Sequence, residues 1–221
     1  REHDRHPDWR MIRADGTSIR AGELEKRTMR CAPPKGYRYG NCCPNNPEYR
    51  AFTLSQVDEM LEYFDLDALF FDMPFWINTC YCEHCRAAYG GEIPVEPIAG
   101  STEYRRLVEF KYQSMGNFVH LVTDHVKQRR ADMPVEYNIA TTVVFGSDVG
   151  CGEEVLEACD YVGGDLYGDL YNHSFACKFY KNATANQPFE QMFSRCKPAL
   201  RMHTLTKSHD EMMTALSSTM Q

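Results

Sequence analysis

The apolar positions of the chain follow two patterns that alternate, helical spacing and short continuous runs. Apolar residues recur at helical spacing over residues 53–64, which predicts a helix with Ser55 as its cap. Residues 66–72 then form an apolar run without alternation, which predicts a strand buried on both faces. A long stretch over residues 102–130 has helical spacing again and predicts a second helix.

The same alternation continues to the end of the chain. Residues 134–144 are rich in β-branched side chains and predict the next strand. Ser208, followed closely by two acidic residues, predicts the start of a final helix. Further strands are predicted over residues 160–167 and 188–194, and further helices over residues 153–159, 173–184 and 208–220. Helices and strands that alternate in this way predict a parallel sheet covered by helices, an α/β fold.

The composition is that of a folded protein. The chain has 221 residues, of which 43% are hydrophobic, enough for a packed core. The net charge is −7 and no basic stripe is present, which argues against a nucleic-acid partner. The apolar runs are too short to span a membrane. We expect one domain over residues 1–221, irregular over residues 1–52, with a cysteine-rich insertion at 73–101.

Acidic and amide side chains recur near the ends of the predicted strands. Asp72 closes the first strand, Glu136 and Asn138 lie in the second, Asp165 closes the third and Glu190 lies in the fourth. Each could simply cap a loop or pair with an arginine, but together they occupy corresponding places of one repeat. In (β/α) barrels, which have such a parallel sheet, the active site lies at the carboxyl ends of the strands. Glycoside hydrolysis needs two carboxylates that face each other across a cleft.

Cysteines cluster directly after the first predicted strand. Cys80, Cys82 and Cys85 form a C-x-C-x-x-C pattern, which favours a metal ion over disulfides because three thiolates can converge from one turn. Unligated thiols are the alternative. A reduced thiolate cluster also favours a cytoplasmic location.

Two segments resemble the α-L-fucosidases of glycoside hydrolase family 29. VDEMLEYFDLDALFFDMPFW, residues 57–76, resembles the segment whose aspartate is the nucleophile, which implies that role for Asp72. QPFEQMFSRC, residues 187–196, resembles the strand that carries the acid/base, which implies that role for Glu190, although Phe189 stands where that family has tryptophan.

The cysteine segment resembles a different family. CYCEHC, residues 80–85, is similar to the zinc-binding loop of family 42 β-galactosidases, in which a fourth cysteine comes from an earlier loop. Cys42 and Cys43 both fit that place, and the resemblance implies a structural zinc ion held by four thiolates. In that family the strand-four acid is the proton donor and a later glutamate is the nucleophile, which would exchange the roles of Asp72 and Glu190.

Nearly the whole chain is similar to the hypothetical glycosyl hydrolase 6 group, which implies a partial (β/α)8 TIM barrel with strands four to seven in this chain. The rest of the barrel would lie outside it, so we expect a fragment. The expected function is a retaining, α-L-fucosidase-like glycoside hydrolase with a carbohydrate substrate. There are three alternatives: a β-galactosidase-like enzyme in which Asp72 and Glu190 exchange roles, a non-catalytic carbohydrate-binding barrel, and a zinc hydrolase. Each of these could form a homo-oligomer. Residues expected to contact the sugar are Trp76, Glu136, Asn138, Asp165, Tyr167, Arg195 and His203.

Overall fold

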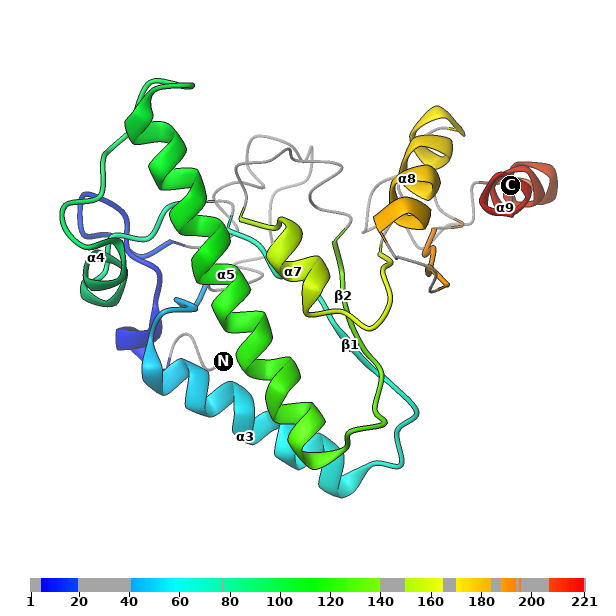
Figure 1. Ribbon diagram of the computed structural model, residues 1–221, viewed down its shortest axis with the longest axis horizontal. Helices are drawn as coiled ribbons and strands as arrows, with labels where there is room; N and C mark the ends of the chain where they lie inside the picture. The colour runs from blue at the N-terminus through cyan, green and yellow to red at the C-terminus, as the bar shows by residue number, and fades with distance from the viewer. Residues whose placement is uncertain are drawn as a thin grey trace.

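Helices alternate with short parallel strands along the chain (Figure 1). The computed structural model describes residues 5–19, 41–76, 78–139, 150–164, 170–183, 188–193, 195 and 207–220. Its elements are η1 (Pro7–Trp9), α3 (Pro47–Tyr63), β1 (Leu69–Phe71), α4 (Glu83–Tyr89), α5 (Thr102–Arg129), β2 (Val135–Tyr137), α7 (Glu153–Glu157), α8 (Leu170–Ala183) and α9 (His209–Thr219).

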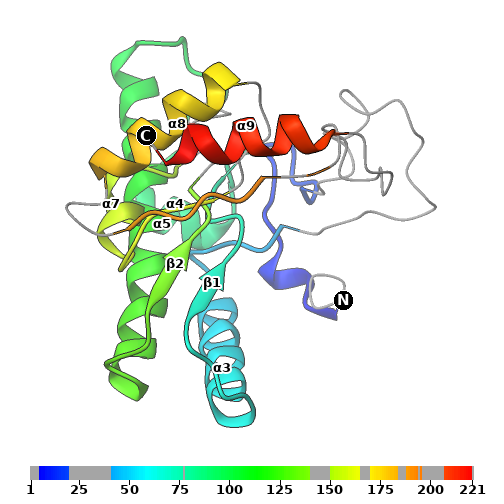
Figure 2. The ribbon, with the colours of Figure 1, turned by 90° about the vertical axis from the view of Figure 1, so that its right-hand side faces the viewer.

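The sheet is parallel, as the alternating pattern predicts. β1 and β2 pair in parallel and lie side by side in Figure 2. Two parallel bridges extend this order, one between Asn138 and Gly163 and one between Val162 and Phe189. Four consecutive strand segments therefore lie next to one another in the order of the sequence. This order is what a (β/α)8 barrel requires of successive strands.

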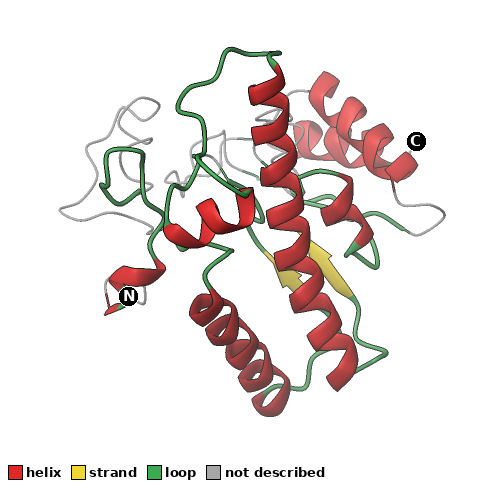
Figure 3. Ribbon diagram, turned by 60° about the vertical axis from the view of Figure 1, so that its left-hand side comes forward, coloured by secondary structure: helices red, strands yellow, loops and turns green. Residues whose placement is uncertain are grey.

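Helices α3 and α5 cover one face of the sheet, and in Figure 3 the strands lie behind α5. Val119, Val122 and Val126 form the buried stripe of α5, with exposed fractions of 0%, 1% and 0%. Burying each such side chain stabilises the fold by about 1.5–3 kcal/mol. α7 packs closely on the same helix, because Gly116 leaves the space that Glu154 fills: a Cβ atom there would lie 2.6 Å from the Glu154 Cβ.

A buried tyrosine fixes which way the strand side chains point. The Tyr137 hydroxyl donates a hydrogen bond of 2.9 Å to the Val119 carbonyl of α5. The Phe71 ring stacks on the Tyr137 ring with centroids 5.2 Å apart, so both face the helices. Successive side chains of a strand point to opposite faces. The residues that face away from the helices are therefore Phe70, Asp72, Glu136 and Asn138.

Two sequence predictions about α3 and β1 are wrong in detail. α3 begins six residues before the predicted start: Asn46 is its cap and accepts a hydrogen bond of 2.9 Å from the Tyr49 N–H. Ser55 lies inside the helix, where its hydroxyl donates to the Phe52 carbonyl at 2.7 Å. β1 is not buried on both faces, since Phe70 is 41% exposed on the side opposite the helices.

The predicted cap of the last helix is confirmed. The Ser208 side chain accepts from the Glu211 N–H, and the Glu211 side chain accepts from the Ser208 N–H at 2.7 Å, which forms a capping box. The predicted cysteine-rich insertion contains the short helix α4. Among the described helices, none combines the length and the apolar character that crossing a membrane requires.

Candidate active site and thiol cluster

Two of the predicted acids, Asp72 and Glu190, lie at the same end of the sheet. The Asn138 N–H donates to the Phe71 carbonyl at 2.9 Å, and the Glu190 N–H donates to the Val162 carbonyl at 2.9 Å. These bonds and the strand pairing set four residues level with one another, just where the parallel strands end. In order across the sheet they are Asp72, Asn138, Gly163 and Glu190.

Asp72 is exposed and has a defined partner. Its Oδ1 atom accepts a hydrogen bond of 2.8 Å from the Asn138 Nδ2. The Asn138 side chain is itself buried, at 4% exposed, so its rotamer is fixed by packing. The amide therefore orients the Asp72 carboxyl group toward the open face of the sheet.

Glu136 lies one step deeper on the same face. It is 1% exposed, and the neighbouring side chains that act on its carboxyl group are Glu190 and the hydroxyl of Tyr161. Burial, and next the negative charge of Glu190, raise the pKa of Glu136 to about 8. Both effects favour the neutral form of the Glu136 carboxyl near pH 7, because the second acid beside it disfavours another negative charge.

Gly163 makes this approach of Glu136 and Glu190 possible. A Cβ atom at Gly163 would overlap the Glu136 Oε1 and would lie 2.7 Å from the Glu190 Cβ. The φ angle at Gly163 is not positive, so crowding and not backbone strain requires glycine here. The pair Gly163-Gly164 within a strand was the available sequence signal, because such glycines mark close approach of neighbouring groups.

Replacing Gly163 with alanine is expected to destabilise the protein by about 3 kcal/mol, because the methyl group displaces two packed glutamates. The matched control is Gly16→Ala. At Gly16 φ is +82° and no atom lies within 4 Å of the added Cβ, so only backbone strain of about 1 kcal/mol is expected. Urea unfolding of the three proteins measures the difference, and equal losses in the two variants would contradict the crowding.

The other residues predicted to contact the sugar do not join this row. Trp76 is a correction: it is 1% exposed and its ring meets Phe110 edge-on at 5.6 Å, so it belongs to the core and offers no stacking face. Arg195 is exposed and its carbonyl accepts from the Lys207 N–H at 3.1 Å; among the described contacts none joins it to Asp72 or Glu190. Asp165, Tyr167 and His203 lie outside the described residues.

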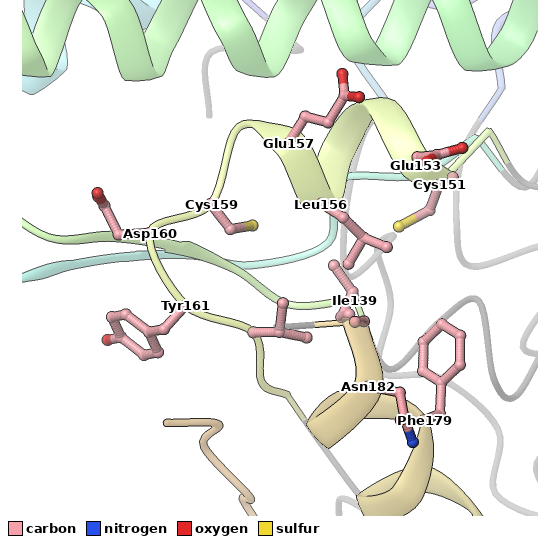
Figure 4. A pocket seen from close by; sticks show the side chains of 13 residues that line it. Ile139, Cys151, Glu153, Leu156, Glu157, Cys159, Asp160, Tyr161, Phe179 and Asn182 are labelled. Carbon is pink, nitrogen blue, oxygen red and sulfur yellow. The ribbon is translucent and has the colours of Figure 1, made fainter. Parts of the chain in front are cut away.

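A cavity of about 720 Å³ lies on the other side of the sheet, between α7 and α8. Figure 4 shows Leu156 of α7 and Phe179 of α8 bordering it, together with Ile139, which follows β2. Ile139 is two residues after Tyr137 and so points toward the helices, away from Asp72. This cavity is therefore separate from the row of strand-end acids.

Four cysteine sulfur atoms converge at a second site. The Sγ atoms of Cys43, Cys80, Cys82 and Cys85 all lie within 4.8 Å of one another. Cys43 Sγ is 3.3 Å from Cys85 Sγ and 3.5 Å from Cys82 Sγ. Four sulfurs around a tetrahedral ion at about 2.3 Å would be about 3.8 Å apart, so the spacing fits a thiolate metal site.

Two donors from outside the cluster contact its sulfur atoms. The Asn45 Nδ2 donates to Cys85 Sγ at 3.5 Å, and the Ile12 N–H donates to Cys80 Sγ at 3.4 Å. Donors of this kind stabilise ligating thiolates and fix their orientation. Hydrogen bonding with Cys43, ahead of that with Cys80 and Cys85, lowers the pKa of Cys82, whereas hydrogen bonding with Cys80 and then Cys82 raises the pKa of Cys43. The four thiols therefore titrate as one coupled group.

Cys42, one of two candidates for the fourth ligand, is not part of the cluster. Its backbone pairs with Arg10 in an antiparallel bridge, and the Cys43 N–H donates to the Trp9 carbonyl at 2.7 Å. In an extended segment neighbouring side chains point in opposite directions, so only Cys43 reaches the other sulfurs. All the described cysteines are free thiols.

Comparisons with known proteins agree with the fold. No protein-family model matches the sequence, and no curated protein matches it. Among solved structures, the chain is similar to the β-galactosidase from Rahnella sp. R3, with a TM-score of 0.65 and 12% sequence identity. It is also similar to the β-galactosidase from the psychrophilic Marinomonas ef1, with a TM-score of 0.64 and 13% identity. The β-galactosidase from the Antarctic haloarchaeon Halorubrum lacusprofundi gives a TM-score of 0.61 and 16% identity. Each match covers 98% of this chain but only 36%, 40% and 39% of the other chain, respectively. The fold of this chain is therefore a part of a (β/α)8 barrel.

Proposed function

We propose that this chain carries part of the active site of a retaining glycoside hydrolase that acts on β-galactosides. The observation that carries the proposal is the row of Asp72, Asn138 and Glu190 at the carboxyl ends of parallel strands. Three strand spacings of about 4.8 Å separate the two carboxyl-bearing residues along the sheet. The curvature of a barrel turns strands that far apart toward each other, so both side chains can face one sugar.

Glu190 is the proposed nucleophile and Asp72 the proposed proton donor. This is the β-galactosidase-like assignment of roles, and the similarity to three β-galactosidase structures supports it over the α-L-fucosidase-like assignment. Glu190 would attack the anomeric carbon while Asp72 protonates the departing oxygen. Water, deprotonated by Asp72, would then release the sugar with its configuration retained. Asn138 would hold Asp72 in place.

The metal ion proposed for the thiol cluster is zinc, in a structural role. Four thiolates form a closed site with no open position for water or substrate. Cys43 comes from the segment before α3, while the other three ligands follow β1. Zinc bound there would tie these two segments together and would stabilise the loop that begins at Asp72.

The experiment that tests the function is hydrolysis of paired nitrophenyl glycosides by the gene product in its full length. The β-D-galactoside is expected to be cleaved at least about 100-fold faster, by kcat/KM, than the α-L-fucoside, a difference of about 2.7 kcal/mol. Proton NMR of the first product should show the β anomer, since the carboxylate mechanism retains configuration. Faster cleavage of the fucoside would overturn the substrate class. Sugar binding without cleavage of any glycoside would instead indicate a non-catalytic barrel.

A further inference from the structure

Glu136 is a buried acid to which the proposed reaction gives no direct step. The side chain is 1% exposed, and the hydrogen bond from Tyr161 offsets only a part of the cost of burying a charge there. A buried carboxylate with so few donors is unfavourable, whereas a neutral carboxyl group is itself a donor. Glu136 therefore holds a proton that an acceptor close by could share.

The neighbour best placed to accept that proton is Glu190. The two side chains approach each other over Gly163, where a Cβ atom would collide with both of them. Phe70 of β1, the residue paired with Glu136, is uncharged. The titratable groups that face Glu136 from the elements around it are Glu190, Tyr161 and Cys159.

We propose that Glu136 is a positioning residue whose protonated carboxyl group donates across Gly163 to Glu190. The donated hydrogen bond keeps the Glu190 carboxyl group aimed toward the open face of the sheet. The proton remains on the pair through the reaction and is not transferred to the sugar. The catalytic consequence rests on the proposed function, but the carboxyl pair is a property of this chain alone.

The pair makes the site sensitive to alkaline pH. Burial and the Glu190 charge raise the pKa of Glu136 to about 8, so the shared proton is present at pH 6 and is lost as the pH rises through 8. Two carboxylates without a proton between them repel each other, and Glu190 then loses its fixed position. Below its folded-state pKa the pair is intact, so the contribution of the pair to activity should be lost on the alkaline side.

The direct test is a carbon NMR titration of the full-length gene product with labelled glutamate carboxyl groups, in which Glu136→Gln identifies the Glu136 signal. The signal is expected to titrate near pH 8, and in Glu190→Gln its midpoint should fall by about one unit or more, because the like charge is removed. In the control Tyr161→Phe the midpoint should not fall. A midpoint near the ordinary value of about 4.3, or one that Glu190→Gln leaves unchanged, would overturn the pair.

A kinetic test on the full-length gene product then separates positioning from a merely structural role. Glu136→Gln keeps a neutral donor, so it should retain kcat at pH 6 within about threefold and should lose the alkaline fall that Glu136 causes. Glu136→Leu should lower kcat about 10- to 100-fold at pH 6 with KM unchanged. An alkaline fall that persists unchanged in Glu136→Gln would refute the positioning role. If no glycoside is cleaved, the proposed function fails while the titration still decides whether the pair exists.

Discussion

Cys43→Ser is expected to weaken zinc binding at least about 100-fold. Structural zinc held by four ligands contributes about 10–16 kcal/mol, so one thiolate accounts for roughly a quarter of that, about 3 kcal/mol. Cys43 is 0% exposed and lies 3.3 Å from Cys85 Sγ, so the remaining three sulfurs would be left without the ligand that completes the tetrahedron. The variant should also unfold at lower denaturant concentration when zinc is present.

The matched control is the same substitution one residue earlier, Cys42→Ser. Cys42 lies outside the group of converging sulfurs, so this variant should keep the zinc content and the stability of the parent protein. Metal content after dialysis and competition with a coloured chelator measure both variants. Equal loss of zinc from the two proteins would show that the fourth ligand has been misassigned. Zinc retained in Cys43→Ser would remove the cluster as a metal site.

Asp72→Asn and Glu190→Gln are each expected to lower kcat on an alkyl β-galactoside at least about 1,000-fold, or about 4 kcal/mol of transition-state stabilisation. Each amide keeps the shape of the carboxyl group but can neither attack carbon nor donate an acidic proton. The control is Asp132→Asn, the same chemical change at the opposite end of β2. The Asp132 side chain is 77% exposed there, and its replacement should leave activity unchanged.

The leaving group separates the two proposed roles. A dinitrophenolate departs without protonation, so Asp72→Asn should release the first equivalent of dinitrophenol from its galactoside in a rapid burst. Glu190→Gln should show no burst, because the nucleophile is absent in that variant. Stopped-flow absorbance measures both. The reverse pattern would restore the fucosidase-like assignment, with Asp72 as the nucleophile.

The order of the fold could be predicted from the sequence because it depends on local periodicity. The apolar face of α5 and the β-branched run of β2 both lie where the pattern predicts them, and alternation alone implies a parallel sheet. The start of α3 was missed although Asn46, Pro47 and Glu48 are a cap, a first-turn proline and a first-turn acid. The prediction relied on the spacing of apolar residues. Because the first turns of α3 are polar, that spacing begins only after the helix has started.

Contacts between distant segments could not be predicted in the same way. Cys42 and Cys43 have the same chemistry, and their roles differ only because the bridge to Arg10 turns one of them away. Trp76 was expected to contact the sugar, but its large apolar ring packs on Phe110 instead. The role of each cysteine and the burial of Trp76 depend on tertiary packing, which cannot be predicted from a short stretch of sequence.

The glycine beneath the two glutamates couples three positions that are far apart in the sequence. With Glu136 and Glu190 in place, position 163 admits no side chain at all. Shortening Glu136 would remove one of these contacts, but the backbone carbonyl oxygen of residue 190 would still lie 2.8 Å from an added Cβ. The requirement for glycine at 163 therefore comes from the close approach of two backbones as well as from the acids. It would outlast the loss of the acid pair, so a relative without the glutamates is still expected to keep this glycine.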